Sequence, residues 1–370
     1  MNKISFLILF FSFFLGSCQK NNEFIDTNNF SYKAETVVDG LEIAWGMVFL
    51  PDGSMLISEQ EGDLIHFKND VKTKISNVPE VVYKNQGGLL DIELHPDYKN
   101  TGWIYFSFSG NIEKDDQGAN TTIMRAKLDG ERLVDQEILY KATPNTKKTQ
   151  HYGSRLEFDQ NGYLFFSIGD RGNRDENPQD ITRDGGKIYR INADGSIPQD
   201  NPFAQKDGAK KAVYSYGHRN PQGMALHPES GKIWVHEHGP KGGDEINIIE
   251  PAENYGWPKI TYGINYSGTP ITEDKALPGM KQPLHYWVPS IAPSGMTFIT
   301  SDKYPGWKHK LLVGSLKFKY LNLITIENGK VTKEEKLLDG MGRVRTVRIG
   351  PDGFIYVSIE QLGIVKLVSN

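Results

Sequence analysis

Cysteine is nearly absent from this chain, whose 370 residues include one, at position 18. A single cysteine cannot form a disulfide within the chain, so no covalent cross-link can stabilise the fold. Its position, discussed below, also leaves no free thiol for catalysis in the processed chain. The folded part must therefore be held together by its hydrophobic core.

Excess positive charge and long hydrophobic segments are also missing. The formal net charge of −4 argues against a nucleic-acid-binding surface. After position 18, no apolar run is long enough to cross a membrane. The motifs Gly-x-Ser-x-Gly, His-Glu-x-x-His and Gly-x-Gly-x-x-Gly and the P-loop are absent, so a serine-hydrolase elbow and Rossmann-type nicotinamide or flavin chemistry have little support.

The first 18 residues have the features of an export signal. Lys3 supplies a positive charge, and Ile4 to Leu15 form a 12-residue apolar run that is too short to span a bilayer. The run ends in Leu15-Gly16-Ser17-Cys18, which resembles the bacterial lipobox, where an acylated cysteine follows small residues. We predict a lipoprotein signal peptide over 1–18 rather than an ordinary signal peptide with a stray cysteine. The protein is then a bacterial membrane-anchored lipoprotein that faces the periplasm or lies on the cell surface.

The remainder of the chain has the composition of an all-β protein. Residues 19–33 are rich in Asn, Asp and Gln and predict a flexible tether, which leaves residues 34–370 as one domain. The chain contains 38 glycines, 19 prolines and 11% aromatic residues, a composition that suits many tight turns. No capped amphipathic helix of 12 residues lies between the turns described next.

A turn followed by a short apolar strand recurs six times. The turns offer Gly or Asx for left-handed backbone angles, and the segments after them are β-branched or aromatic. The predicted strands lie at 54–58, 103–107, 163–167, 232–236, 310–314 and 354–358. Six repeats favour a closed six-bladed β-propeller over a two-sheet sandwich or an open array, because a ring leaves only short, protected edges. Residues 362–368 are expected to complete a blade with a strand around 34–38.

The loops between these strands carry an ordered series of polar motifs. They are Asn85–Leu89, Gln150–Arg155, Gly169–Arg171, Gly217–Gly223, His236–Glu245, Asn254–Pro258, Ile264–Gly268, Ser315–Lys317 and Arg343–Arg345. Each motif is weak alone, but the ordered series resembles the soluble glucose dehydrogenases that depend on pyrroloquinoline quinone (PQQ), and most of all their aldose sugar dehydrogenase branch. The resemblance runs from about Leu41 to Leu367, and the family's fold is a six-bladed propeller, in agreement with the repeats.

The resemblance implies a catalytic group. His151 matches the family's general base, which takes the proton of the anomeric hydroxyl while C1 delivers hydride to the quinone. Asp170 matches the carboxylate that orients and stabilises the imidazolium, although its spacing fits a turn-forming residue before Gly172 nearly as well. Arg219 and Asn220 resemble the pair that grips the quinone oxygens.

The resemblance also implies a cofactor site and a metal site. PQQ carries three carboxylates, which call for cations, and in an extended strand Arg343 and Arg345 would project to one face. The matched cofactor residues are Gln86, Arg219, Asn220, Tyr266, Gly314, Ser315, Leu316, Lys317, Arg343, Val344 and Arg345. The carbonyls of Gly239 and Pro240 match ligands of the cofactor Ca²⁺, and Glu245 and the Tyr255 carbonyl match a further calcium position. His236 and His238 could suggest zinc, but packing or mouth-lining roles are favoured because no clear third ligand is near.

These observations predict a PQQ- and calcium-dependent aldose dehydrogenase that forms aldonolactones and passes electrons to an external acceptor. Phe318, Lys319 and Tyr320 are bulkier than expected beside a cofactor, and the chain lacks long insertions that would narrow the choice of sugar, so broad aldose specificity is expected. Two alternatives remain open: a non-catalytic propeller that binds carbohydrate or protein, and a calcium-dependent sugar-lactone hydrolase.

Overall fold

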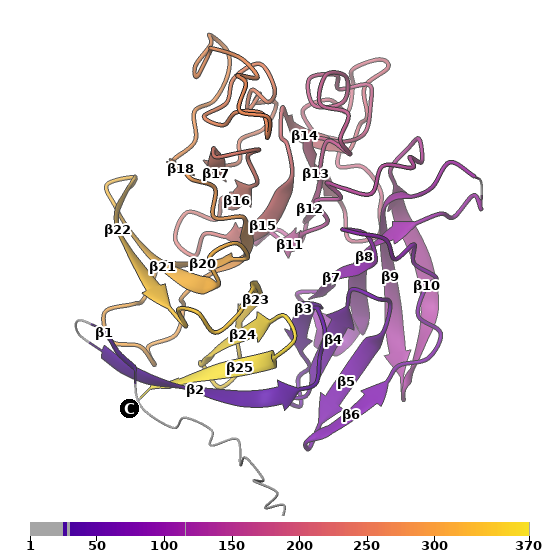
Figure 1. Ribbon diagram of the computed structural model, residues 1–370. Coiled ribbons are helices and arrows are strands. Elements are labelled where there is room, and N and C mark those ends of the chain that lie inside the picture. Colours follow the sequence, from indigo (N-terminus) through magenta and orange to yellow (C-terminus); the bar gives the residue numbers. More distant parts are fainter. Residues whose placement is uncertain (1–24, 28–29, 115, 370) are drawn as a thin grey trace, which may run out of the picture.

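The chain folds into six β-sheets arranged in a ring (Figure 1). The computed structural model describes residues 25–27, 30–114 and 116–369, so the predicted signal peptide and Cys18 lie outside the described residues. Within the described residues there is one helix, α1 (Tyr98–Thr101), and it has only four residues. None of the described helical structure is long and apolar enough to cross a membrane.

The strands follow one another from the inside of each sheet to its outside. The first two sheets contain β3 (Ala44–Phe49), β4 (Met55–Glu59), β5 (Leu64–Lys68) and β6 (Val71–Lys74), then β7 (Leu89–Leu94), β8 (Trp103–Gly110), β9 (Asn120–Asp129) and β10 (Arg132–Lys141). The next two contain β11 (Leu156–Phe158), β12 (Leu164–Ile168), β13 (Lys187–Ile191) and β14 (Val213–Tyr216), then β15 (Pro221–Leu226), β16 (Ile233–Glu237), β17 (Asp244–Ile248) and β18 (His285–Trp287). The last two contain β19 (Pro293–Phe298), β20 (Leu311–Ser315), β21 (Tyr320–Glu327) and β22 (Lys330–Leu337), then β23 (Val344–Ile349), β24 (Ile355–Ile359), β25 (Gly363–Ser369), β2 (Phe30–Asp39) and β1 (Ile25–Thr27).

The ring is closed on both its inner and outer sides. Each innermost strand contacts the innermost strands of both neighbouring sheets, in the cycle β3, β7, β11, β15, β19, β23 and back to β3. The sixth sheet joins the two ends of the chain: β25 pairs with β2, with Ala34 opposite Leu367 and Val38 opposite Ile364. The predicted six-bladed propeller and its closing blade are therefore confirmed.

The boundary predicted at residue 34 lies inside a strand. β2 begins at Phe30, and the side chain of Tyr32 is fully buried between the fifth and sixth sheets. Its hydroxyl accepts a hydrogen bond of 3.0 Å from the Leu338 backbone N–H. Residues 30–33 thus belong to the propeller rather than to a tether, because the tyrosine ring and the β2–β25 ladder hold them.

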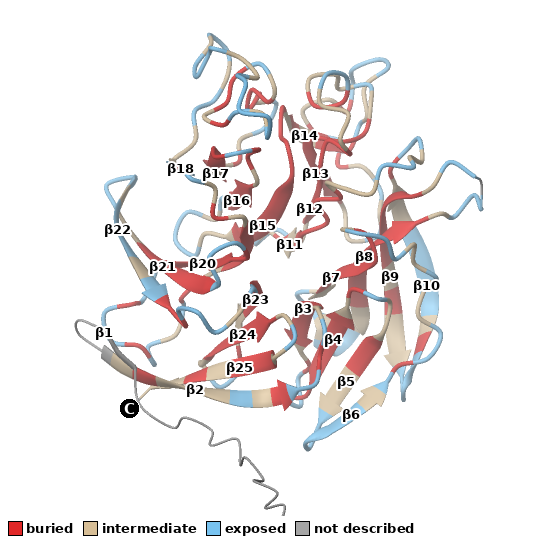
Figure 2. Ribbon diagram, in the orientation of Figure 1, coloured by how far each residue is buried: buried red, intermediate tan, exposed pale blue. Residues whose placement is uncertain are grey.

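The hydrophobic core consists of six layers, each between two neighbouring sheets. All six predicted turn-strand repeats correspond to second strands: β4, β8, β12, β16, β20 and β24. In β12, β16, β20 and β24 every residue is buried, because adjacent blades cover both faces (Figure 2). This burial explains why second strands are mostly apolar and outer strands such as β6 and β22 are not.

Most of the innermost strands contain a β-bulge near the same mouth of the central channel. In five of the six sheets the register between first and second strand shifts close to the start of the first strand. The residue without a partner is Trp45 in β3, Gln222 in β15 and Arg345 in β23. Because a bulge redirects side chains locally, these three can point along the channel instead of into a blade interface.

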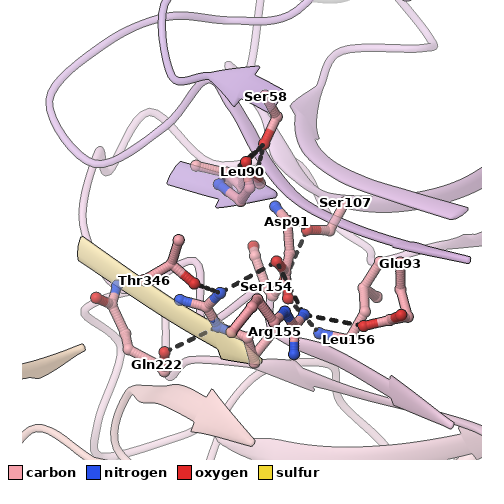
Figure 3. Close-up of polar contacts among 12 residues, drawn as sticks. Ser58, Leu90, Asp91, Glu93, Ser107, Ser154, Arg155, Leu156, Gln222 and Thr346 are labelled. Atoms are coloured by element: carbon pink, nitrogen blue, oxygen red, sulfur yellow. Dashed lines mark hydrogen bonds and ion pairs between the residues drawn. The ribbon is translucent and has the colours of Figure 1, made fainter. Parts of the chain in front are cut away.

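A buried polar network crosses the channel below this mouth (Figure 3). The Arg155 guanidinium contacts Asp91 Oδ1 at 3.1 Å, the Gln222 carbonyl at 3.1 Å and Thr346 Oγ1 at 3.4 Å. It also lies 4.2 Å from the centre of the Trp45 ring. These groups come from five blades, so the network ties the inner strands together and forms a floor between the two ends of the channel.

A candidate active site at one mouth of the channel

Two adjoining cavities lie above this floor, at the mouth where the innermost strands begin. One has a volume of about 790 Å³ and the other about 520 Å³. Gln86, Pro240 and Tyr266 line both, so the two form one continuous hollow. Tyr266 stands at the rim with 74% of its side-chain surface exposed. The loops that carry the motifs of the sequence therefore converge, although they are far apart along the chain.

The larger cavity is strongly cationic. Lys241, Lys317, Arg343 and Arg345 line it, and Glu360 is the one carboxylate among its described lining residues. This surplus of positive charge lies in a protein of formal net charge −4. Such a local concentration of cations is suited to a ligand that carries several negative charges.

The two arginines meet at a single carboxylate. Arg343 Nε lies 2.6 Å from Glu360 Oε2, and Arg345 contacts Glu360 Oε1 through Nε at 3.0 Å and through Nη2. They do not meet by the simple strand alternation expected from the sequence, because Arg343 precedes β23 and Arg345 is the bulged residue of that strand. Both guanidiniums nevertheless reach one anion, the carboxylate of Glu360, and their contact with the cofactor stays a prediction.

The smaller cavity contains the predicted His–carboxylate pair. His151 Nδ1 lies 2.7 Å from Asp170 Oδ1. The carboxylate can only accept there, so the proton is on Nδ1 and the lone pair is on Nε2 of the neutral ring. His151 has a left-handed backbone with φ of 58°, and its backbone N–H donates to Gln86 Oε1 at 2.7 Å. Gln86, which lines both cavities, thereby holds the backbone of His151 in place.

Asp170 is held from three sides. Its Oδ2 accepts a 2.9 Å hydrogen bond from the Trp257 indole, and its Oδ1 accepts one of 2.7 Å from the Gly172 backbone N–H. The Asn177 amide donates to its backbone carbonyl at 3.0 Å. The bond to Gly172 is the turn contact expected for an Asx residue, so Asp170 forms the turn and orients His151 at the same time.

Burial and neighbouring charges together set the pKa values of His151 and Asp170. It lowers the pKa of the His151 imidazole, and the hydrogen bond to Asp170 raises it by less. Burial raises the pKa of the Asp170 carboxyl, but the bond from His151 and the nearby Arg219 more than offset that effect and leave the pKa below its ordinary value. A neutral imidazole beside a fixed carboxylate is the arrangement of a general base.

Arg219 lies between the base and the predicted calcium loop. Its Nη1 donates to the His238 carbonyl at 3.0 Å and to the Gly239 carbonyl at 2.9 Å, and its guanidinium lies 5.4 Å from the Trp257 ring. Asn220 is fully buried and lines neither cavity. Its Oδ1 accepts from the Gly153 N–H at 3.1 Å, and its Nδ2 has no partner among the described residues.

The other predicted cofactor residues divide between wall and support. Leu316 lines the larger cavity, and its carbonyl accepts a 3.2 Å bond from Arg343 Nη1. Ser315 Oγ donates to the Ile291 carbonyl at 2.9 Å. Gly314 packs against Val344, where an added Cβ would lie 2.6 Å from a valine methyl. Gly314, Ser315 and Val344 therefore support the wall and do not line it.

The predicted metal residues occupy neighbouring positions. Gly239, Glu245 and Tyr255 line a small third cavity, whereas Pro240 lines the two larger ones. The Asn247 amide donates to both Glu245 and Glu237 at 3.2 Å. Burial and the charge of Glu237 raise the pKa of Glu245 to about 8. A carboxylate pair held this close is stabilised by any cation that binds beside it.

One of the two candidate zinc histidines is packed in the protein interior, and the other lines the larger cavity. His236 is fully buried, and neither ring nitrogen has a hydrogen-bond partner within the described part of the chain. His238 lines the larger cavity and contacts the Pro293 carbonyl at 2.5 Å, and burial lowers its pKa to about 3. Among the described residues, no group of three or more His, Cys, Asp or Glu side chains is arranged to hold a metal ion.

Several site residues were missed from the sequence. Trp45 and Gln222 line the larger cavity because of their bulges, and Glu360 and Trp257 hold the arginine pair and Asp170. A bulge leaves no local sequence signal that could have revealed the first two. Glu360 directly follows β24, one position beyond its last residue Ile359, and no local sequence signal marked it.

Known proteins resemble this chain over nearly its whole described length. A family model described as glucose/sorbosone dehydrogenase matches residues 41–366. The aldose sugar dehydrogenase YliI of Escherichia coli is 42% identical over 335 residues, which cover 88% of this chain and 90% of that protein.

Solved structures share the fold. The soluble aldose sugar dehydrogenase of Escherichia coli in its apo form superposes with a TM-score of 0.87 at 39% identity, covering 92% of this chain and 100% of that one. The PQQ-bound aldose sugar dehydrogenase of Streptomyces coelicolor has a TM-score of 0.75 at 28% identity, covering 92% and 98%.

Proposed function

Since the chain belongs to the glucose/sorbosone dehydrogenase family, we propose that it oxidises aldose sugars at C1 to aldonolactones with PQQ as its cofactor. One observation carries the proposal above the others. The His151–Asp170 pair lines one part of a continuous hollow, and the cations line the adjoining part. A sugar beside His151 and an anionic cofactor beside the arginines would therefore be in contact.

The larger cavity fits PQQ by its charge. Three ligand carboxylates match the surplus of cations contributed by Lys241, Lys317, Arg343 and Arg345 over Glu360. Gln86 and Tyr266 would contact it at the wall shared with the sugar. When bound, PQQ supplies the acceptor for the hydride from C1 of the sugar. The name of the Streptomyces coelicolor relative, which is PQQ-bound, supports the same assignment.

The calcium loop is suited to a cation. The carbonyls of His238 and Gly239 converge on the Arg219 guanidinium, which shows that this backbone presents oxygens to a positive charge. Gly239 and Pro240 would supply carbonyl oxygens to Ca²⁺, a hard ion that takes such ligands. Glu245, with the Tyr255 carbonyl, would hold a further calcium, which would relieve its repulsion with Glu237.

The residues of this chain perform the proton chemistry. His151 Nε2 accepts the proton of the C1 hydroxyl as the hydride leaves C1. Asp170 accepts a hydrogen bond from the Nδ1–H group of His151 throughout the reaction and stabilises the imidazolium that forms. Arg219 adds positive charge where the hydroxyl develops negative charge. Release of the lactone and removal of a proton from Nε2 return the base to its starting state.

Reconstitution tests the proposal. The ligand-free protein is incubated with PQQ and Ca²⁺, and reduction of an artificial electron acceptor is followed with glucose, other aldoses and a non-reducing sugar as control. We expect several aldoses to be oxidised, and the non-reducing sugar to be inert because it has no anomeric hydroxyl. The proposal would be refuted if aldoses caused no dye reduction and the quinone spectrum did not change when sugar was added.

The alternatives have less support from the geometry. A lactone hydrolase of this type would gather several acidic side chains on one metal, and the described residues contain no such group. A non-catalytic binding propeller would need neither a neutral imidazole oriented by a carboxylate nor a cationic cradle beside it. Hydrolysis of an aldonolactone, or sugar binding unaffected by His151→Ala, would favour one of these instead.

The location of the protein is a separate proposal. Lipobox processing would leave an acylated Cys18 at the new N-terminus and anchor the propeller to a bacterial membrane, with electrons passing to an external acceptor. Mass spectrometry of the N-terminal peptide from the exported protein would detect the acyl chains. A Cys18→Ala variant that fractionates with the membrane as the parent does would contradict this proposal.

A further inference from the structure

Glu360 is an acidic residue in a cavity that is otherwise cationic. It lies at the end of β24, lines the larger cavity and has a side chain that is only 10% exposed. A carboxylate at this position repels an anionic ligand and neutralises part of the charge that attracts one. Its retention there needs a compensating role.

The contacts of Glu360 show what it does to the arginines. Its Oε2 accepts from Arg343 Nε at 2.6 Å and its Oε1 accepts from Nε and Nη2 of Arg345. Arg345 is buried, so two neighbouring guanidiniums without an anion would pay both desolvation and mutual repulsion. The carboxylate removes this cost and fixes the direction of both planes.

The arginines keep donors for a second anion. Among the described residues, Nη2 of Arg343 and Nη1 of Arg345 make no hydrogen bond, and both residues line the cavity. Each guanidinium thus uses one edge for Glu360 and leaves a terminal nitrogen for a ligand. Pre-orientation of this kind reduces the ordering that a ligand must impose on binding.

We infer that Glu360 is a positioning residue that stands in for a ligand carboxylate: it orients Arg343 and Arg345 and weakens their pull on anions until the cofactor binds. The inference rests on the proposed function, because the ligand is the tricarboxylate PQQ. It predicts a trade. Glu360 stabilises the protein without the cofactor, and the same carboxylate weakens PQQ binding relative to what the arginines alone would give.

A charge-removing variant tests this trade. Glu360→Gln keeps an acceptor oxygen but loses the charge. PQQ binding is titrated at fixed Ca²⁺ by quenching of tryptophan fluorescence, since Trp45 lines the cavity. We expect the variant to bind PQQ roughly tenfold more tightly, as removal of one nearby charge at the dielectric of a protein surface implies. The trimethyl ester of PQQ should bind both proteins equally, because it carries no carboxylate charge.

Thermal unfolding supplies the second measurement. The midpoint of ligand-free Glu360→Gln should fall, and saturating PQQ should raise it by more than it raises the parent's. Glu93→Gln is the matched control, because Glu93 makes a comparable 2.9 Å pair with Arg348 at the other end of the channel and lines neither cavity of the site. This control should lower both midpoints equally and leave the PQQ affinity unchanged.

Unchanged or weaker PQQ binding by Glu360→Gln would overturn the inference, as would equal losses of midpoint with and without PQQ. If that variant does not fold, Glu360→Asp decides the matter, because it keeps the charge but is too short to hold both arginines. It should bind PQQ several-fold more weakly than the parent, and parental affinity would refute the orienting role. Failure of the parent itself to bind PQQ would instead refute the proposed function.

Discussion

At the scale of single residues, the site depends on how His151 is held. The imidazole is fixed through Nδ1 by Asp170, and Asp170 is fixed by Trp257 and Gly172. The family resemblance implied roles for His151 and Asp170 as general base and orienting carboxylate. The structure places the two side chains in contact. The partner Trp257 was not assigned a role, because nothing in the chain's order indicates which aromatic residue will face a carboxylate 87 positions away.

Removing the base should abolish most turnover without loss of the cofactor. We expect His151→Ala to reduce kcat by about 10²–10⁴-fold, the usual contribution of a positioned general base. The PQQ affinity should change little, because the arginines that bind its carboxylates line the other cavity. Steady-state kinetics and fluorescence titration measure the two quantities. A kcat within threefold of the parent would show that another group takes the proton.

The acid limb of the pH–rate profile should lie unusually low. The reaction needs neutral His151, and burial lowers its folded-state pKa below the ordinary 6.5. Asp170 opposes this shift, whereas the cations Arg219 and Arg171 reinforce it, and His238 stays neutral nearby. Activity should therefore persist as the pH falls through 6.5 and be lost only at lower pH. A half-maximal kcat/KM above pH 6.5, corrected for stability, would contradict this account.

The indole that holds Asp170 can be tested with a shape-conserving change. Trp257→Phe removes the hydrogen bond to Asp170 Oδ2 but keeps an aromatic ring. We expect kcat to fall roughly tenfold, since a bond to a charged group contributes about 1.5–3 kcal/mol to the orientation of the carboxylate. Trp234→Phe is a suitable control, because its indole nitrogen has no partner in the described structure. A similar kcat for both variants would show that Asp170 needs no such support.

At the scale of elements, the sequence revealed the strands that are buried on both faces. Second strands such as β12 and β24 are apolar except for one serine each, because a blade covers each side, and a Gly-containing turn marks their start. Outer strands such as β22 alternate or are polar, since one face meets solvent, and no distinct pattern marks them in the sequence. The bulges of the inner strands depend on packing around the channel, so the residues they present, Trp45, Gln222 and Arg345, followed from the structure alone or from family resemblance.

The glycine of the first inner strand tests how tightly the strands pack around the channel. A Cβ at Gly46 would lie 2.9 Å from Asp91 Oδ1 and 3.0 Å from Ser58 Oγ. We expect Gly46→Ala to lower the free energy of unfolding by about 1–3 kcal/mol, the usual cost of overpacking. Gly53→Ala, where no atom lies within 4 Å of the added Cβ, should cost only the strain of its φ of +83°, about 1 kcal/mol. Chemical denaturation compares the two, and equal losses would show that β3 can move aside.

At the scale of the whole molecule, an ion pair joins inner strands of different blades at the centre of the ring. Strand pairing within the sixth sheet joins the two ends of the propeller's chain. The Arg155–Asp91 pair connects inner strands of different blades beneath the active site. The six repeats predicted the ring, in agreement with the family resemblance. Neither predicted this network, because a buried ion pair between two blades, 64 residues apart in the sequence, leaves no trace in local composition.

Breaking the central pair should destabilise the entire ring. We expect Arg155→Met to lower the free energy of unfolding by about 3–5 kcal/mol, because buried Asp91 would keep only Arg348, 3.9 Å away, as a counter-charge. The double variant with Asp91→Asn should lose less than the sum of the single losses, since it leaves no unpaired charge. A double-mutant cycle measured by denaturant unfolding checks this, and strict additivity would mean that the two groups stabilise the fold independently.

The pairing of β2 with β25 has a consequence for how the protein is made. β2, near the start of the propeller, has no neighbour on its β25 side until residues 363–369 have been synthesised, so the ring cannot close before then. The other five sheets are built from consecutive segments and need no such wait. This dependence keeps the polypeptide from reaching its closed, folded shape before residues 363–369 have emerged from the ribosome.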